Sequence, residues 1–402
     1  MIALGNLGAS EMLGVRRKLN GERRALSNLT GCPVDFIEQH GGRLILHRDG
    51  SDTTYQLRRQ MDHYHSSVAS VVEKHITARD YRLVYIRYPG FCDLALLRML
   101  RHLRHSTIVM EVPTYPFNDE RTVIWKTLVK SRRLFRLFQL IIQILFDQLT
   151  RTRLRKYVDR LVCIGNPPEM LWGIATARMS NGSDMAEDPL PKYTAQPCTM
   201  RMICVASLQD SHGVDRLIRG MAEYISQNPT PKLHLDVVGY GAVISSLQRM
   251  TSAHGLQDSI AFHGFKSGSE LRDLYESSDI GIGSLALHRV GRESSSVLKV
   301  CEYCVLGLPF VYAYHDFGFS EDLPFCLRLP ASDDPINISD VIAFWRSLDA
   351  LDDVRRVTRA YAEQHLSWEA VLAPALGSLL TPIRLSSDRT YGTQSPDSPD
   401  VV

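Results

Sequence analysis

The sequence predicts an α/β protein with two doubly wound domains, each built on a parallel sheet. Short apolar runs alternate with helical segments in the first half, and the alternation restarts after the polar, Pro-containing stretch 181–197. Strand–helix–strand repeats of this kind form parallel sheets with crossover helices. The length of 402 residues also exceeds the roughly 100–200 residues of a single domain. We therefore expect more than one domain, each with its own core.

In the first half, the apolar runs predict strands at residues 83–88, 107–112 and 161–165, with a helix over 94–103. Pro113 is expected to end the second of these strands, because proline cannot donate a hydrogen bond to a sheet. The first domain is expected to comprise residues 1–195.

In the second half, strands are expected at 200–206, 233–238, 260–264, 280–283 and 309–313. The helices between them are expected at 214–225, 244–254, 269–277 and 297–306. Gly307 is expected just past the last of these helices, where a left-handed residue commonly ends the helix. The second domain is placed at 196–350. A helical segment is expected over 351–385 and a solvated tail, poor in apolar residues, over 386–402.

Composition excludes some classes of protein. Lys and Arg number 46 against 44 Asp and Glu, a net charge of +2, which argues against a globally basic nucleic-acid binder. The eight cysteines are scattered, as buried thiols in a reducing compartment would be. Cys301 and Cys304 lack a second ligand pair at zinc spacing, so we expect core packing and no bound metal.

The charge is unevenly distributed, because residues 121–160 contain eleven Lys and Arg against only Asp147 and Asp159. The apolar middle of this basic segment, 134–146, is too short to span a bilayer. Apolar bulk flanked by cations is typical of a helix that lies on an anionic membrane surface. The alternative is a buried crossover helix with solvated ends. With no recognisable signal peptide or membrane span, we expect a cytoplasmic protein, peripheral on the inner face of the cell membrane.

Residues 292–303 indicate an anion site. Three serines, 294–296, precede an apolar helical run, so one of them is expected to cap the helix. Free N–H groups at a helix start bind phosphate, and Arg289, Arg292 and Lys299 would add positive charge. Glu302 could accept hydrogen bonds from the hydroxyls of a ribose. The alternative is an ordinary capped helix with a Lys–Glu pair.

Five segments in order resemble the donor-binding domain of family 4 glycosyltransferases of the GT-B fold. They are HGVDRLI at 212–218, VVGYG at 237–241, the stretch 260–284, LKVCEYCVLGLPFV at 298–311, and LSWE at 366–369. The resemblance implies two Rossmann-like domains that face a cleft, with a C-terminal helix crossing back to the first domain. It also implies a nucleotide-diphosphate sugar as donor substrate and no permanently bound cofactor. For the glycines of VVGYG, a tight turn without ligand contact stays open as an alternative.

The first half is similar to bacterial exopolysaccharide and capsule glycosyltransferases. The similarity lies in GVRRKL at 14–19, YIRYPGFCDLALL at 85–97, EVPTYPFNDE at 111–120 and NGSD at 181–184. It implies that the first domain binds the acceptor, a growing polysaccharide or a lipid-linked saccharide. The resemblance to family 4 implies that transfer proceeds with retention.

Site residues follow from the motifs that match the family. The expected catalytic residues are Glu293, Ser294, Lys299 and Glu302. The residues expected to bind the donor are Gly239, Gly241, His212, Phe265, Arg292, Ser295, Ser296 and Leu298. The residues expected to contact the acceptor are Gly14, Asp119 and Glu120.

Three positions depart from the family pattern. Ser294 stands where the family has an acid, with Glu293 one position earlier, and Ser207 and His212 replace the family's Arg and Lys. The leaving diphosphate would then rely on Lys299, Arg292, the helix start and a protonated His212. These departures keep two alternatives open: a non-catalytic protein that binds nucleotide sugars as a scaffold, and a transferase with a small soluble acceptor.

Overall fold

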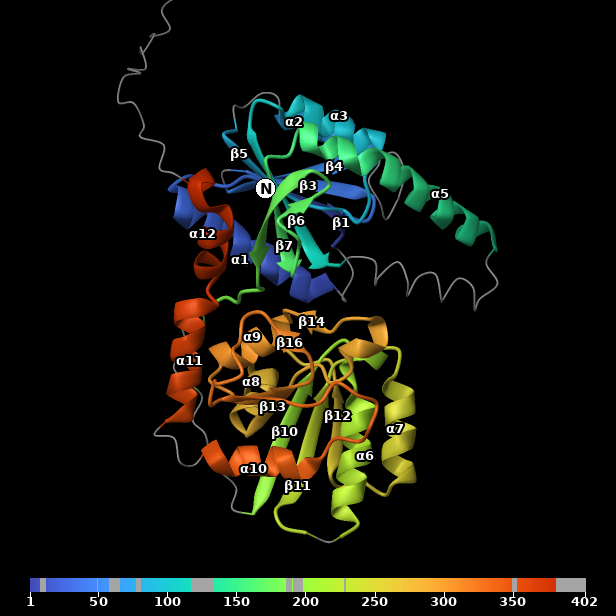
Figure 1. Cartoon of the computed structure of the whole chain (residues 1–402), viewed down its shortest axis with the longest axis vertical. Helices are drawn as coiled ribbons and strands as arrows, with labels where there is room; N and C mark the ends of the chain where they lie inside the picture. The colour runs from blue at the N-terminus through green and yellow to red at the C-terminus, as the bar shows by residue number, and fades with distance from the viewer. Residues whose placement is uncertain are drawn as a thin grey trace, which may run out of the picture.

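The computed structural model describes residues 1–7, 12–48, 50–57, 66–76, 81–116, 134–185, 190, 198–227, 229–348 and 353–380. Two sheets, each with helices packed against it, lie one above the other (Figure 1). The structure is α/β with largely parallel strands, as expected.

The first sheet has nine strands in the order β4-β3-β2-β1-β5-β6-β7-β9-β8. Their bounds are β1 Ile2–Asn6, β2 Phe36–His40, β3 Arg43–Arg48, β4 Ser51–Gln56, β5 Leu83–Arg87, β6 Thr107–Tyr115, β7 Arg160–Gly165, β8 Met170–Leu171 and β9 Ile174–Met179. The prediction that Pro113 ends its strand is wrong, because β6 continues to Tyr115. The β6–β7 register shifts between Val112 and Tyr115, so the strand passes its proline at an irregularity in the ladder.

The helices of the first half are α1 Leu13–Thr30, α2 Ser66–Ile76, α3 Leu94–His102 and α5 Leu134–Thr150. The predicted helix at 94–103 corresponds to α3, whose start is capped by Asp93, since its carboxylate accepts the Leu96 N–H. No described helix is both long and apolar enough to cross a membrane.

The second sheet has six parallel strands in the order β12-β11-β10-β13-β15-β17. Their bounds are β10 Thr199–Val205, β11 Lys232–Val238, β12 Ile260–Gly264, β13 Ile280–Ile282, β15 Phe310–Tyr312 and β17 Cys326–Arg328. All of them were expected except β17. The order reverses between β10 and β13, and ligands of open α/β sheets bind beyond the carboxyl ends of strands at such a point.

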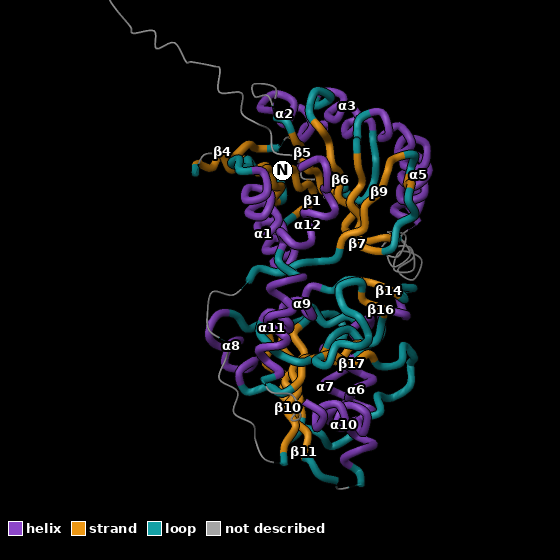
Figure 2. Tube along the Cα trace, turned by 60° about the vertical axis from the view of Figure 1, so that its left-hand side comes forward, coloured by secondary structure: helices purple, strands orange, loops and turns teal. Residues whose placement is uncertain are grey.

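The remaining helices are α6 Val214–Ile225, α7 Ile244–Ala253, α8 Gly268–Glu276, α9 Leu298–Val305, α10 Ile338–Leu348, α11 Val354–His365 and α12 Trp368–Leu376. The C-terminal segment forms two helices, α11 and α12. Ser367 caps the start of α12, since its hydroxyl oxygen accepts the Ala370 N–H at 3.1 Å. Figures 1 and 2 both place α12 against α1, so the C-terminal helix crosses back to the first half as expected.

Candidate functional site

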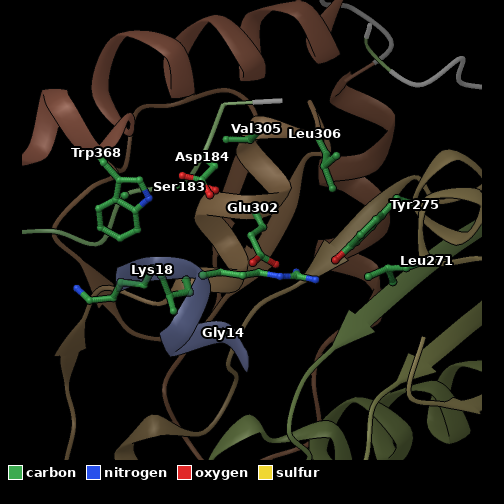
Figure 3. Close-up of a pocket in the computed structure, with 13 residues that line it drawn as sticks. Gly14, Lys18, Ser183, Asp184, Leu271, Tyr275, Glu302, Val305, Leu306 and Trp368 are labelled. Carbon is green, nitrogen blue, oxygen red and sulfur yellow. The ribbon is translucent and has the colours of Figure 1, made fainter. Parts of the chain in front are cut away.

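A pocket of about 290 Å³ lies where the two halves meet. Side chains from α1, α8, α9 and α12 surround it, together with the segment that follows β9 (Figure 3). It is lined by Gly14, Arg17, Lys18, Gly182, Ser183, Asp184, Leu271, Tyr275, Leu298, Glu302, Val305, Leu306 and Trp368. The two sheets thus share a cavity large enough for part of a small ligand.

Three predicted site residues meet at this pocket: Gly14, Leu298 and Glu302. Figure 3 shows the Glu302 carboxylate pointing from α9 into the space between α1 and Tyr275. Burial raises the pKa of Glu302, and the positive charge of Arg17 partly opposes that rise. A β-carbon added to Gly14 would have no neighbour within 4 Å, so this helix position leaves room in the pocket.

The serines before α9 do not cap it, so that prediction is wrong. Ser294–Ser295 form the short strand β14, which pairs with β16, His315–Asp316. The residue that caps α9 is Val297, which has no side-chain acceptor to offer. Ser296 is engaged elsewhere, because its hydroxyl accepts the Asn181 N–H at 2.8 Å. No side chain before the helix therefore caps its first N–H groups, although the Val300 N–H donates to the Val297 carbonyl at 3.2 Å.

Lys299 lies in the first turn of α9 with its side chain buried. Only 8% of the residue is exposed, and its Nζ has no hydrogen-bond partner among the described residues. Burial lowers the pKa of Lys299, since a charge removed from water without a partner is costly. A bound anion would supply the missing partner.

His212, beyond β10, is close enough to Lys299 to be affected by its charge. Burial and Lys299 together lower the pKa of His212 to about 3. The expectation of a protonated His212 is therefore wrong, because the ring is neutral at physiological pH. Its Nδ1 accepts the Gln209 N–H at 3.1 Å, which places the proton on Nε2. His212 can thus donate one neutral hydrogen bond to an anion.

Gly239 and Gly241 follow β11. A β-carbon at Gly239 would collide with the Ala206 carbonyl oxygen, and one at Gly241 with that of Leu208. The Leu208 N–H donates to the Tyr240 backbone carbonyl at 2.8 Å, which holds the loop after β10 against the loop after β11. These glycines are required for the close approach of two backbones. That requirement fits the tight-turn alternative, and a contact with the donor stays a prediction.

The other predicted residues lie around this region. Arg292 is partly buried, Phe265 is 54% exposed, and the Glu293 side chain is exposed while its carbonyl accepts the His315 N–H. Asp119 and Glu120 lie outside the described residues.

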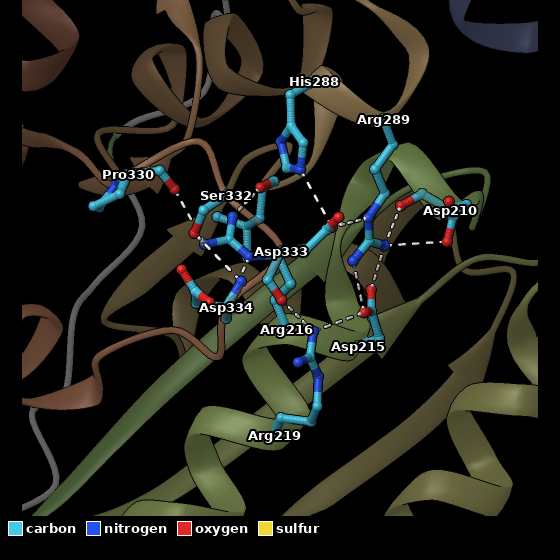
Figure 4. Close-up of polar contacts among 11 residues, drawn as sticks. Asp210, Asp215, Arg216, Arg219, His288, Arg289, Pro330, Ser332, Asp333 and Asp334 are labelled. Atoms are coloured by element: carbon cyan, nitrogen blue, oxygen red, sulfur yellow. Dashed lines mark hydrogen bonds and ion pairs between the residues drawn. The ribbon is translucent and has the colours of Figure 1, made fainter.

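Arg289 was expected to add positive charge beside the anion site, but its guanidinium is occupied by carboxylates (Figure 4). It binds Asp215 through two nitrogens at 2.8 and 2.9 Å, Asp333 at 2.6 Å and Asp210 at 3.1 Å. These carboxylates raise the pKa of Arg289 and neutralise its charge locally. Arg289 therefore joins loops of the second half, and Lys299 is the cation at the start of α9.

The sequence did not single out the buried charges next to the pocket. Lys18 Nζ lies 2.7 Å from Glu22, 3.0 Å from Glu111 and 3.2 Å from the Asn181 side-chain oxygen. It also lies 5.2 Å from the centre of the Trp368 ring. Burial and the charge of Glu111 raise the pKa of Glu22 to about 7. The GVRRKL motif contains Lys18, but its partners are too distant in sequence to be inferred.

Residues 195–321 match the family described as Glycosyl transferases group 1. This region contains β10 to β16 and thus His212, Lys299 and Glu302. A curated relative, mannosylfructose-phosphate synthase from Agrobacterium fabrum, is 25% identical over 120 residues. The matched stretch covers 28% of this chain and only 25% of that relative's length.

Solved structures share the overall fold. Sucrose-phosphate synthase from Thermosynechococcus elongatus aligns over 92% of this chain and 96% of its own, with TM-score 0.59 and 16% identity. A glycosyltransferase from Rickettsia africae aligns over 92% and 95%, with TM-score 0.56 and 11% identity. Anabaena HepE in complex with UDP aligns over 92% and 96%, with TM-score 0.55 and 13% identity. The fold is therefore the two-domain GT-B fold.

Proposed function

We propose that this protein is a glycosyltransferase that moves a sugar from a nucleotide-diphosphate sugar to a saccharide acceptor. The observation that carries the proposal is the buried, unpartnered ammonium of Lys299 at the uncapped start of α9. The group 1 match over 195–321 includes this helix and therefore supports the proposal. HepE, with the same fold, is a protein that was crystallised with UDP.

The chemistry follows from where charge develops. As the bond between the sugar C1 and the diphosphate oxygen breaks, negative charge grows on the leaving oxygen and positive charge on C1. Lys299, the first N–H groups of α9 and the neutral His212 would stabilise the leaving diphosphate. The acceptor hydroxyl forms the new bond to C1 and gives its proton to a departing phosphate oxygen. With both events on one face of the sugar, the transfer proceeds with retention.

Glu302 lies one turn further along α9, where its carboxylate can accept hydrogen bonds from the donor's ribose. The pocket contributes Gly14 and Arg17 from the first half, and we propose that the acceptor approaches from that side. A growing polysaccharide or lipid-linked saccharide, reached at the inner face of the cell membrane, is the proposed acceptor class. Glu293 and Ser294, at the family's acid positions, are proposed to contact the sugar.

The decisive experiment measures nucleotide release from a panel of nucleotide-diphosphate sugars, with and without saccharide acceptors. At least one donor should turn over, and Lys299→Met and Glu302→Gln should each abolish that turnover. The matched control is Glu363→Gln, since Glu363 is exposed and its ion pair is with Arg359, one turn earlier in α11. Tight donor binding with no turnover for any donor would favour the scaffold alternative.

A further inference from the structure

Helix α5 is attached to the first half by polar groups on its inner side. The buried Asp147 carboxylate accepts the Tyr88 hydroxyl at 2.8 Å and the Cys92 N–H at 2.7 Å. The Thr150 hydroxyl donates to the Cys92 carbonyl at 2.8 Å. An ordinary surface helix buries its apolar stripe and exposes its charges. The C-terminal part of α5 instead has its carboxylate facing the protein.

The outer side of α5 is correspondingly apolar. Phe138 is 60% exposed, Leu145 54% and Leu149 72%. Among the side chains of α5 that the structure describes, the exposed large apolar ones are Phe138, Ile141, Ile142, Leu145, Phe146 and Leu149. Their spacing of three and four residues places most of them on one face of the helix. In Figure 1, α5 runs along the outer edge of the first half and extends beyond the sheet. This apolar stripe contradicts the alternative of a buried crossover helix, because its large side chains face solvent.

The charge around the stripe is positive. Arg153, Arg155 and Lys156, which directly follow α5, are exposed. Of the two acids of the basic segment 121–160, Asp147 is buried and Asp159 is exposed, and each accepts a backbone N–H. Asp147 binds Cys92, and Asp159 accepts the Ile108 N–H at 2.7 Å. Exposed Arg153, Arg155 and Lys156 therefore outnumber the exposed Asp159, and the net charge beside the stripe is positive.

We infer that α5 is a docking surface for an anionic lipid bilayer, in which its apolar stripe lies parallel to the membrane plane. A helix of 17 residues is about 25 Å long, so the stripe can lie in the headgroup region along most of its length. The helix does not meet the length and hydropathy of a span. An anionic bilayer matches both features at once, since it accepts apolar side chains and attracts the flanking cations. Only the purpose of docking, access to a lipid-linked acceptor, rests on the proposed function.

The test measures cosedimentation of the full chain with vesicles of phosphatidylglycerol and phosphatidylcholine in equal parts. The wild type should bind these vesicles and not vesicles of phosphatidylcholine alone. The triple variant Ile142→Gln, Leu145→Gln, Leu149→Gln should have an affinity for the anionic vesicles that is lower by about tenfold or more. It lacks the apolar side chains that would enter the bilayer. The matched control, Val357→Gln, changes an apolar residue of α11 that is 44% exposed and should bind as the wild type does.

A second variant tests the charges. Arg153→Glu with Arg155→Glu should also release the protein from the anionic vesicles. Vesicle binding by the triple variant at the wild-type level would overturn the inference. So would a wild-type dimer in sedimentation velocity that the triple variant dissociates, since a second copy would then cover the stripe. Vesicle binding needs no donor substrate. All these variants should retain the wild-type rate of turnover of soluble nucleotide sugars. A failure to bind vesicles can therefore be distinguished from a failure of the proposed transferase activity.

Discussion

Asn181 makes two hydrogen bonds to Ser296 across the junction of the two halves. Its backbone N–H donates to Ser296 Oγ at 2.8 Å, and its side-chain Nδ2 donates to the Ser296 carbonyl at 2.7 Å. The side-chain oxygen of Asn181 accepts from Lys18 at 3.2 Å. A continuous polar connection thus runs from α1 to the residue before the cap of α9. It holds the start of α9 in place relative to the pocket.

Asn181→Ala should weaken this connection and leave the Ser296 carbonyl and Lys18 short of a partner. The free energy of unfolding is expected to fall by about 1–3 kcal/mol, the cost of buried polar groups left unpaired. The kcat/KM for the donor should fall about tenfold, since a small displacement of α9 misplaces Lys299. Urea unfolding and donor kinetics measure the two effects. Ser296→Ala, which removes only the acceptor of the Asn181 backbone N–H, should lose less stability than Asn181→Ala; an equal loss would contradict the contribution of the Asn181 side chain.

Lys299→Met should weaken nucleotide-diphosphate binding about tenfold or more while raising thermal stability. Both effects have one cause, the cost of burying an ammonium that has no hydrogen-bond partner among the described residues. Burial lowers the pKa of Lys299 in the folded protein, so the unfolded chain holds the Lys299 proton more tightly. The free energy of unfolding of the unliganded protein should therefore increase as the pH rises above the pKa that Lys299 has in the folded protein. Calorimetry with a nucleoside diphosphate and thermal unfolding check both effects. A variant that loses binding and stability together would show that Lys299 is structural.

The parallel strands of the second half could be predicted because each is a short apolar run between helical segments. The edge strands could not. β17 contains only Cys326–Arg328, and β3 and β4 carry mixed polar residues, so their pairing depends on neighbours that the local pattern does not contain. Likewise Pro113 stays within β6 only because the ladder is irregular there.

In the candidate site, too, some features could be predicted from the sequence and others could not. Lys299 and Glu302 could be found because both lie on one helix beside recognisable motifs. The occupied state of Arg289 could not, since Asp210 and Asp215 lie at the start of α6 and Asp333 lies more than 40 residues away from Arg289. The neutral state of His212 also depends on its burial beside Lys299, which only the folded chain defines.

Asp316→Asn should flatten the pH dependence of stability. Burial raises the pKa of Asp316 from 3.8 to about 7. Between these values the folded protein keeps a proton that the unfolded chain releases, so stability falls as pH rises from about 4 to 7. Between pH 4 and pH 8, the free energy of unfolding of the variant should rise relative to that of the wild type by up to about 4 kcal/mol. The Asn side chain can still accept the Gly318 N–H, which Asp316 binds at 2.9 Å. Urea unfolding across this range measures the effect, and the exposed Asp322→Asn serves as control.

Arg289→Met should lower stability and leave donor binding almost unchanged. The guanidinium joins the start of α6 and the loop at Asp333 through its carboxylate partners, two of which are largely exposed, so a loss of about 1–2 kcal/mol is expected. Arg356→Met is the control, because Arg356 is exposed and its ion pair is with the neighbouring Asp353. The measurements are urea unfolding and the KM for the donor. A large rise in KM with unchanged stability would restore Arg289 to the anion site.

Gly14→Val should block the pocket without harming the fold. An added β-carbon at Gly14 has no neighbour within 4 Å, and at this position in the first turn of α1 valine is tolerated at least as well as glycine. The new methyl groups would enter the space that faces Glu302, so turnover should fall at least about tenfold while the unfolding free energy stays within about 0.5 kcal/mol. Gly14→Ala, with one small methyl, should have an intermediate effect on turnover. If Gly14→Val keeps full activity, substrates do not use the part of the pocket beside α1, and the proposed approach of the acceptor from that side is wrong.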